Sequence, residues 1–120
     1  PADQQQSSET RMDLSNIPFA TTDWSTVSTT EHPGETGIAT WRTVDLGCVR
    51  VRRVDYSANY KSDHWCKRGH ILFVLEGELV TELEDGRVFT LSAGMSYQVQ
   101  HDGEAHRSET QTGAKLFIVD

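Results

Sequence analysis

Hydrophobic and polar residues alternate over short stretches from residue 39 to the end of the chain, which predicts β-strands. Successive side chains of a strand point to opposite faces, so alternation marks strands that bury one face. We expect strands over residues 39–46, 48–56, 69–75, 78–83, 87–91, 95–100, 106–110 and 115–119. No segment shows a sustained helical period or a fixed repeat. Many short strands at fairly even spacing indicate an all-β sandwich or barrel.

Turn residues separate these stretches. Asp85-Gly86 is the strongest hairpin signal, because this pair suits the positive backbone angles of a tight turn. Gly77 is expected to close a second turn, and Asp102-Gly103 and Thr112-Gly113 mark two more. Residues 21–40 are rich in Thr and Ser and include a Pro-Gly pair, which predicts irregular or edge structure.

Basic residues concentrate in two places, at Arg50, Arg52, Arg53, Lys67 and Arg68. Because the arginines alternate with valines, we interpret them as a solvated strand face rather than as a patch for an anionic ligand. The parity of the apolar residues changes near Arg52-Arg53, which also predicts a β-bulge there. The net charge of -7 argues against binding of nucleic-acid phosphates.

Length and composition suit one small domain. The chain has 120 residues, of which 36% are hydrophobic and 24% charged. Residues 1–16 begin with a polar run that has little to bury, so we expect a flexible N-terminal extension followed by one domain over residues 17–120. No apolar run approaches a membrane span, and no leader pattern opens the sequence. With Cys48 and Cys66 interpreted as reduced thiols, we expect a cytoplasmic protein without membrane contact.

Candidate metal donors gather in a short segment of the chain, Asp63-His64-Trp65-Cys66 and then His70. Side chains two residues apart on a strand point the same way, and His70 shares their parity, so three donors can face one point. Trp65 should point away from that point. His106 follows a later Gly-punctuated stretch and is the fourth candidate. Imidazole and thiolate bind divalent transition metals, so the pattern predicts a metal site formed by His64, Cys66, His70 and His106.

The same residues resemble the motifs of the cupin superfamily. The spacing His64-x-Cys66, three residues, His70, six residues, Gly77 is similar to the first cupin motif, His-x-His, three or four residues, Glu, six residues, Gly. Gly94, His101-Asp102-Gly103, two residues, His106, three residues, Thr110 resembles the second motif, with one extra residue before its turn. The closest likeness is to the small single-domain cupins named for a DHCW motif, which here reads from Asp63 to Cys66.

This resemblance covers about residues 17–120 and implies the fold in more detail. It implies a single-domain cupin, a jelly-roll barrel also described as a double-stranded β-helix, with a divalent metal ion in its lumen. It also implies a homodimer, because small cupins often pair edge strands that would otherwise be exposed.

Two ligand positions depart from the general cupin pattern. Cys66 replaces the second His and His70 replaces the Glu, so the site keeps one negative ligand charge but becomes softer. A thiolate with three imidazoles favours Zn, with Fe, Ni, Cu, Co or Mn as further candidates. Four protein ligands alone would make a closed structural centre, whereas additional positions would leave room for water or substrate.

Several roles stay open from the sequence. Cys66 could instead be a reactive or redox-sensitive thiol, and His101 is the reserve candidate for the position of His106. Asp63 either fixes the tautomer of His64 or forms a turn. Three tyrosines could line a pocket, although packing in a small barrel is the simpler interpretation for Tyr56, Tyr60 and Tyr97.

Two classes of function fit these observations. The first is a small metal-binding domain without turnover, and the alternative is a metal-dependent cupin enzyme, of dioxygenase or isomerase type, acting on a small molecule. No carboxylate occupies a motif position, and the nearest candidates for a general base, Asp63 and Glu104, are placed only by adjacency. The catalytic residues are therefore unassigned. A third, weaker hypothesis is an empty cupin that binds a small organic ligand.

Overall fold

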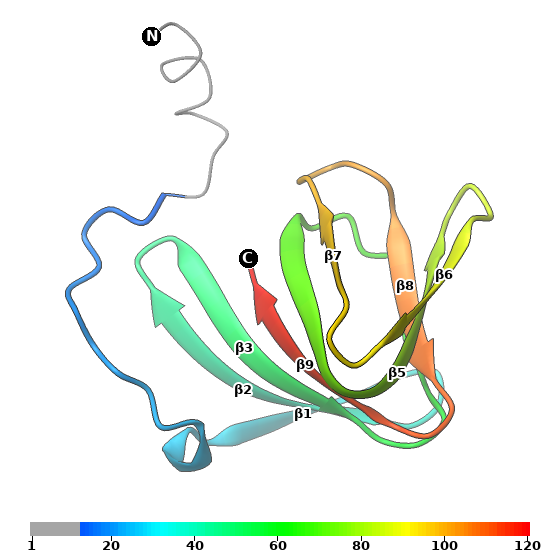
Figure 1. Ribbon diagram of the computed structural model, residues 1–120, viewed down its shortest axis with the longest axis horizontal. Helices are drawn as coiled ribbons and strands as arrows, with labels where there is room; N and C mark the ends of the chain where they lie inside the picture. The colour runs from blue at the N-terminus through cyan, green and yellow to red at the C-terminus, as the bar shows by residue number, and fades with distance from the viewer. Residues whose placement is uncertain (1–12) are drawn as a thin grey trace, which may run out of the picture.

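A computed structural model describes residues 13–120, so the expected N-terminal extension lies, up to residue 12, outside the described residues. The described part contains one short 3-10 helix and nine strands (Figure 1). In chain order these are η1 (Trp24–Thr26), β1 (Thr29–Pro33), β2 (Ile38–Leu46), β3 (Val49–Tyr56), β4 (Tyr60–Lys61), β5 (His70–Leu83), β6 (Val88–Ser92), β7 (Ser96–Val99), β8 (His106–Thr110) and β9 (Ala114–Val119).

The strands curl into two antiparallel sheets that face each other (Figure 1). One sheet has the order β1-β2-β3-β9-β5-β7, and the other has the order β6-β5-β8-β4. Strand β5 belongs to both, its first half to one sheet and its second half to the other. The predicted all-β barrel is therefore confirmed, and the described residues contain no helix long and apolar enough to cross a membrane.

Strand β5 runs without interruption through Gly77, where the sequence predicted a turn between two strands. A bulge between Val74 and Glu76 shifts its register against β9. Gly77 has a φ of 83° and lies too close to the backbone of Gly113 for any side chain, so glycine is required there. Across this bend the buried positions change from even to odd numbers. The predicted turn is wrong because the bend keeps its ladder hydrogen bonds and carries the strand into the second sheet.

The apolar core fills the barrel away from the metal-motif residues. Its largest fully buried side chains come from β3, β5 and β9: Leu72, Leu79, Leu116, Val54 and Val74. Toward the other end of the same strands the inward positions become polar, with His70 on β5 and Arg52 on β3, both buried. The sheet thus provides an apolar base beneath a polar interior.

The prediction of a solvated basic face is wrong for Arg52 and, in part, for Arg50. Strands β2 and β3 pair without a register shift from Ala39 opposite Tyr56 to Leu46 opposite Val49, so the expected bulge is absent. Arg52 therefore faces the interior, where it is only 6% exposed. Its charge is tolerated there because the carboxylate of Asp120 lies 3.0 Å away.

Other local predictions are confirmed. Asp85-Gly86 joins β5 to β6, and the backbone N–H of Leu83 donates to the carbonyl of Arg87 at 2.8 Å. The Thr- and Ser-rich segment supplies the edge strand β1. Cys48 and Cys66 are both free thiols.

Candidate metal centre

Two imidazoles meet inside the barrel, His70 from the start of β5 and His106 from the start of β8. Their Nε2 atoms lie 3.2 Å apart, and the two residues are only 9% and 3% exposed. They are far apart in sequence, so the closure of the barrel brings them together. Of the four predicted ligands, this pair has the best-defined mutual geometry.

The outer nitrogens of the two rings indicate where the protons sit. Nδ1 of His106 lies 2.9 Å from the carbonyl of Glu104, which can only accept, so this Nδ1 donates. Nδ1 of His70 has no hydrogen-bond partner among the described residues, but the carboxylate of Asp120 lies 3.9 Å away and favours a proton there. With these tautomers, inferred from the neighbouring acceptors, the Nε2 atoms of the two neutral rings are the nitrogens free to bind an ion.

Burial also sets the protonation of His70. Desolvation, followed by the nearby charge of His106, lowers the pKa of His70 to about 4. The ring is therefore neutral near pH 7, which is the form that binds metal ions.

Cys66 lies directly beside His106. Its backbone N–H donates to the carbonyl of His106 at 2.7 Å, and the N–H of His106 donates back at 3.0 Å, so both side chains leave the same face of this bridge. Hydrogen bonding to His106 lowers the pKa of the thiol despite burial, with the backbone N–H of Arg68 assisting. Burial opposes charge on His106, yet its hydrogen bonds with Cys66 and the carbonyl of Glu104 raise its pKa overall. The pair favours a thiolate, the metal-binding form of cysteine.

The fourth predicted ligand, His64, lies outside this group. Its side chain is 73% exposed, and its Nδ1 contacts the carboxylate of Asp63 at 2.7 Å. Of the two roles left open for Asp63, the contact with His64 is present, but at the surface. His101, the reserve candidate, is 75% exposed. Trp65 turns away from His106, and the guanidinium of Arg107 lies 4.4 Å from its ring centre.

The donor set fits a metal ion in part. Two nitrogens bound to one tetrahedral ion at ~2.0 Å stand about 3.3 Å apart, close to the 3.2 Å between the Nε2 atoms of His70 and His106. Over residues 13–120, however, no group of three or more His, Cys, Asp and Glu side chains has a geometry that could hold an ion. A complete centre needs the Cys66 thiol to rotate toward the two nitrogens, and His64 to turn inward.

Tyr97 is a site residue that sequence reasoning assigned to packing. Its hydroxyl lies 2.9 Å from Nε2 of His70. Burial raises the pKa of this phenol, so it stays protonated and can donate to the imidazole. Tyr97 on β7 pairs with Leu72 on β5, and Leu72 lies two residues from His70 on the same face of β5. The contact between Tyr97 and His70 therefore follows from the pairing of β7 with β5, which the sequence did not reveal.

A second group, here called the arginine cluster, was also missed: Asp120 with Arg50, Arg52 and Arg68. The Asp120 carboxylate is fully buried, and the three guanidinium groups contact it at 2.9, 3.0 and 3.1 Å. Burial opposes its charge, but the hydrogen bond from Arg50 and the arginine charges lower the pKa of Asp120 overall. Since Leu116 and Ile118 face inward, parity along β9 could have predicted that Asp120 does too.

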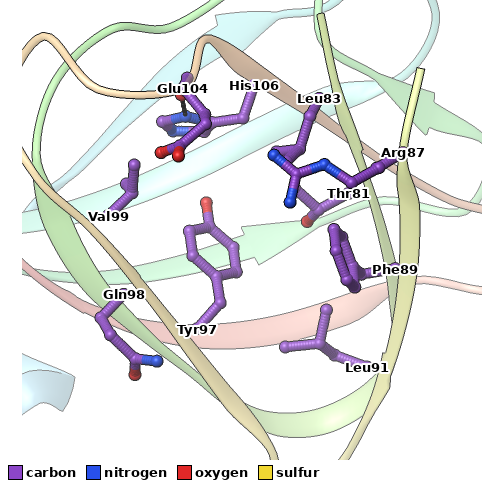
Figure 2. A pocket seen from close by; sticks show the side chains of 10 residues that line it. All are labelled: Thr81, Leu83, Arg87, Phe89, Leu91, Tyr97, Gln98, Val99, Glu104 and His106. Atoms are coloured by element: carbon purple, nitrogen blue, oxygen red, sulfur yellow. Dashed lines mark hydrogen bonds between the residues drawn. The ribbon is translucent and has the colours of Figure 1, made fainter. Parts of the chain in front are cut away.

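A cavity of about 250 Å³ opens beside His106 on the inner face of the second sheet. Paired residues of β5, β6 and β8 form one side of this cavity. His106 on β8 pairs with Leu83 on β5, and two residues along the strands Thr81 on β5 pairs with both Ser108 on β8 and Phe89 on β6. Figure 2 shows the Tyr97 hydroxyl pointing toward His106 and the charged heads of Arg87 and Glu104 at the same opening. His106 therefore lines a space that can admit a small molecule, and Tyr97, which contacts His70, lines it too.

No protein-family model matches the sequence, and no curated protein matches it either. Solved structures do. A predicted oxalate decarboxylase from Thermotoga maritima superposes with a TM-score of 0.71 and 17% identity, over 83% of this chain and 96% of that one. An RmlC-like cupin from Shewanella frigidimarina gives 0.66 and 17%, over 86% and 90%. The polyketide cyclase RemF from Streptomyces resistomycificus gives 0.68 and 22%, over 85% and 78%.

These structural similarities identify the fold. At such low identity they extend to the architecture and not to the ligands or reactions of these proteins. The implied jelly-roll architecture is confirmed, while the likeness to the DHCW group rests on the motif alone.

Proposed function

We propose that this chain, which has the cupin fold, holds a divalent metal ion in its barrel through His70, His106, Cys66 and His64. The observation that carries this proposal is the 3.2 Å separation of the two Nε2 atoms in a buried site. Either a proton on one ring or a cation bound by both can join two imidazole nitrogens at that distance. The lowered pKa of His70 keeps that ring neutral and available as a ligand, and the separation matches that of two nitrogens bound to one tetrahedral ion.

The other two ligands complete the centre in different ways. The Cys66 thiolate already contacts His106 and adds the negative charge that favours Zn over Fe, Ni, Cu, Co or Mn. His64 joins when the bend at residues 63–64 turns inward, and Asp63 then retains its contact with the imidazole. A bound ion would act as a Lewis acid toward any oxygen donor in the neighbouring cavity.

Metal content tests the proposal directly. Protein purified without added metal is analysed for bound elements and then titrated with Co²⁺, whose absorption bands report thiolate ligation. We expect one equivalent of metal in the wild type and a large loss in both His70→Ala and His106→Ala. His101→Ala is the matched control and should bind like the wild type. Equal metal content in all four proteins would contradict the proposal.

An enzyme is the second candidate function, because a cavity opens directly beside His106. The similar structures include a predicted oxalate decarboxylase and a polyketide cyclase. A dioxygenase- or isomerase-type reaction requires a coordination position open to this cavity. Exchangeable water on the bound ion would favour this candidate, and a closed four-ligand centre would exclude it.

A homodimer in the cytoplasm completes the proposal. Three outward-facing apolar side chains of β5 are 49%, 41% and 37% exposed, and they supply a surface that a second copy could cover: Ile71, Phe73 and Leu75. Light scattering of the wild type and of Phe73→Glu would test the dimer, and we expect the variant to be monomeric.

A further inference from the structure

Arg87 presents a free hydrogen-bond donor at the opening of the cavity. Its Nε and Nη2 atoms contact the carboxylate of Asp85 at 2.8 to 3.2 Å. These contacts hold the guanidinium in place and leave Nη1 without a partner among the described residues. A guanidinium fixed in this way is suited to bind a carboxylate.

Glu104 stands across the same opening without pairing with Arg87. No ion pair joins the two side chains in residues 13–120, yet after the larger effects of Asp85 the charge of Glu104 also raises the pKa of Arg87. The two charges are therefore near each other but separated, and both heads face the cavity in Figure 2. Together Asp85, Arg87 and Glu104 sum to one negative charge, which disfavours a simple anion.

Thr81 gives an independent indication that the cavity holds a ligand. The residue is 3% exposed, lines the cavity, and its hydroxyl has no hydrogen-bond partner among the described residues. A buried hydroxyl without a partner is unfavourable, so a polar group of a ligand is expected to satisfy it. Thr81 pairs with Phe89 on β6, and Arg87 lies two residues before Phe89 in the chain. Because residues two apart on a strand point to the same face, a ligand group bound by Arg87 lies on the same inner face as the Thr81 hydroxyl.

The wall of the cavity is apolar and its size is limited. Leu83, Phe89 and Leu91 line it, and Phe89 is 47% exposed. A volume of about 250 Å³ is slightly below the usual range of ligand pockets, which favours a molecule of metabolite size.

We propose that this cavity binds a free α-amino acid with a small apolar side chain. Arg87 and the Thr81 hydroxyl contact the carboxylate, Glu104 contacts the ammonium group, and the side chain lies against Phe89 and Leu91. Both charges of such a zwitterion find an opposite partner, which neither a simple acid nor a simple amine achieves. The inference rests on the proposed function only in placing the ligand beside the metal, because these contacts lie outside the metal ligands.

Three probes with the same apolar side chain test the head-group recognition: L-leucine, 4-methylpentanoate, which lacks the ammonium group, and 3-methylbutylamine, which lacks the carboxylate. Binding to the full chain is measured by calorimetry, with and without prior removal of metal by EDTA. We expect L-leucine to bind at least about tenfold more tightly than either truncated probe, the effect of one hydrogen bond to a charged group. Equal binding of all three probes, tighter binding of the amine, or no saturable binding would overturn the proposal.

Two variants assign the contacts. Arg87→Gln should remove the preference for L-leucine over 3-methylbutylamine, and Glu104→Gln should remove the preference over 4-methylpentanoate. Lys115→Gln and Glu109→Gln, exposed residues that do not line this cavity, are charge-matched controls and should retain both preferences. Loss of both preferences in the controls would contradict the assignment.

The calorimetry on EDTA-treated protein distinguishes the amino-acid site from the proposed metal site. Head-group discrimination that survives EDTA in a protein with no specific metal site would overturn the proposed function alone. Specific metal binding without discrimination between the probes would overturn the amino-acid site alone.

Discussion

Two clusters of polar side chains lie on either side of His70, and they differ in how the protein compensates their charges. On one side lies the arginine cluster, in which Asp120 has 0% side-chain exposure and contacts three guanidinium groups. On the other side lies the histidine cluster of Cys66, His70, Tyr97 and His106, in which the Nε2 atoms of the two histidines lie 3.2 Å apart. Both are buried in the same barrel, and both were assembled from distant strands.

The difference separates a structural role from a binding role. A buried carboxylate with three cationic partners has its charge fully compensated by the protein itself, so its removal affects folding. The histidine cluster instead keeps two buried imidazole nitrogens at a separation that one ion can bridge, so its proposed role is to bind a cation. We therefore expect substitutions in the first cluster to change stability and substitutions in the second to change metal affinity.

The largest effect is expected for Asp120→Asn. This change leaves Arg52 buried without its compensating charge, and breaking such a pair costs about 3–5 kcal/mol in the free energy of unfolding. Urea denaturation measures the loss. Asp55→Asn is the matched control, because its carboxylate is 50% exposed and pairs with Arg53 at 4.0 Å, so it should change stability by less than about 1 kcal/mol. Equal effects of the two substitutions would contradict the structural role of Asp120.

The pH dependence of stability is the next largest effect. Because folding lowers the pKa of His70 from 6.5 to about 4, the unfolded chain takes up a proton in this range that the folded chain does not. The free energy of unfolding of metal-free protein should therefore fall by up to about 3 kcal/mol as the pH falls from 6.5 to 4. The raised pKa of His106 has the opposite effect on stability, because this ring stabilises the folded protein at low pH and loses that contribution as the pH rises through its pKa.

A variant isolates the contribution of His70. His70→Gln keeps His106 and the arginine cluster but loses the titrating ring, so its stability should decline less over the same pH range. Parallel curves for the wild type and His70→Gln would show that burial of His70 does not set this dependence.

Cys66→Ser should have its effect on metal affinity. A direct ligand should contribute at least the ~10–100-fold that outer partners of metal ligands provide. Competition with a chromophoric chelator measures the affinity for Zn²⁺, and Cys48→Ser is the control because Cys48 is also a free thiol. The assignment of Cys66 fails if both variants bind Zn²⁺ as tightly as the wild type.

Tyr97→Phe is expected to have the smallest effect. It removes the hydroxyl that contacts Nε2 of His70 and should cost about 1 kcal/mol in metal-free protein. In Zn²⁺-loaded protein the cost should shrink, since the ion then satisfies the same nitrogen. Thermal unfolding of both forms measures this, with Tyr56→Phe as the control, and a cost that does not depend on metal would argue against an ion at Nε2.

Alternation along the chain was sufficient to predict most of the fold. It placed the strands around His106 and β9, because a strand with one buried face repeats every two residues. It failed at Gly77, where the bulge reverses the parity of the buried positions and a glycine signals a bend rather than an end. Local patterns do not distinguish these cases, because the pairing with β9 that keeps the strand continuous is a long-range contact.

The candidate site was predictable only where a motif fixed it. The spacing around His70 and the choice of His106 over His101 came from the motif, and the structure places His106 inside and His101 outside. Arg52 was not identified because its alternation with valines was taken as the mark of a solvated face, and Asp120 was missed although it shares the parity of Leu116 and Ile118. The contact that compensates the charge of Arg52 comes from Asp120, 68 positions away, and no local pattern predicts that pairing.

A structure of the protein loaded with Zn²⁺ tests the central claim most directly. The account predicts an ion bound to Nε2 of His70 and Nε2 of His106 at ~2.0–2.1 Å, with the sulfur of Cys66 at ~2.3 Å. An ion bound elsewhere on the chain, with the two Nε2 atoms still facing each other and no metal between them, would contradict it.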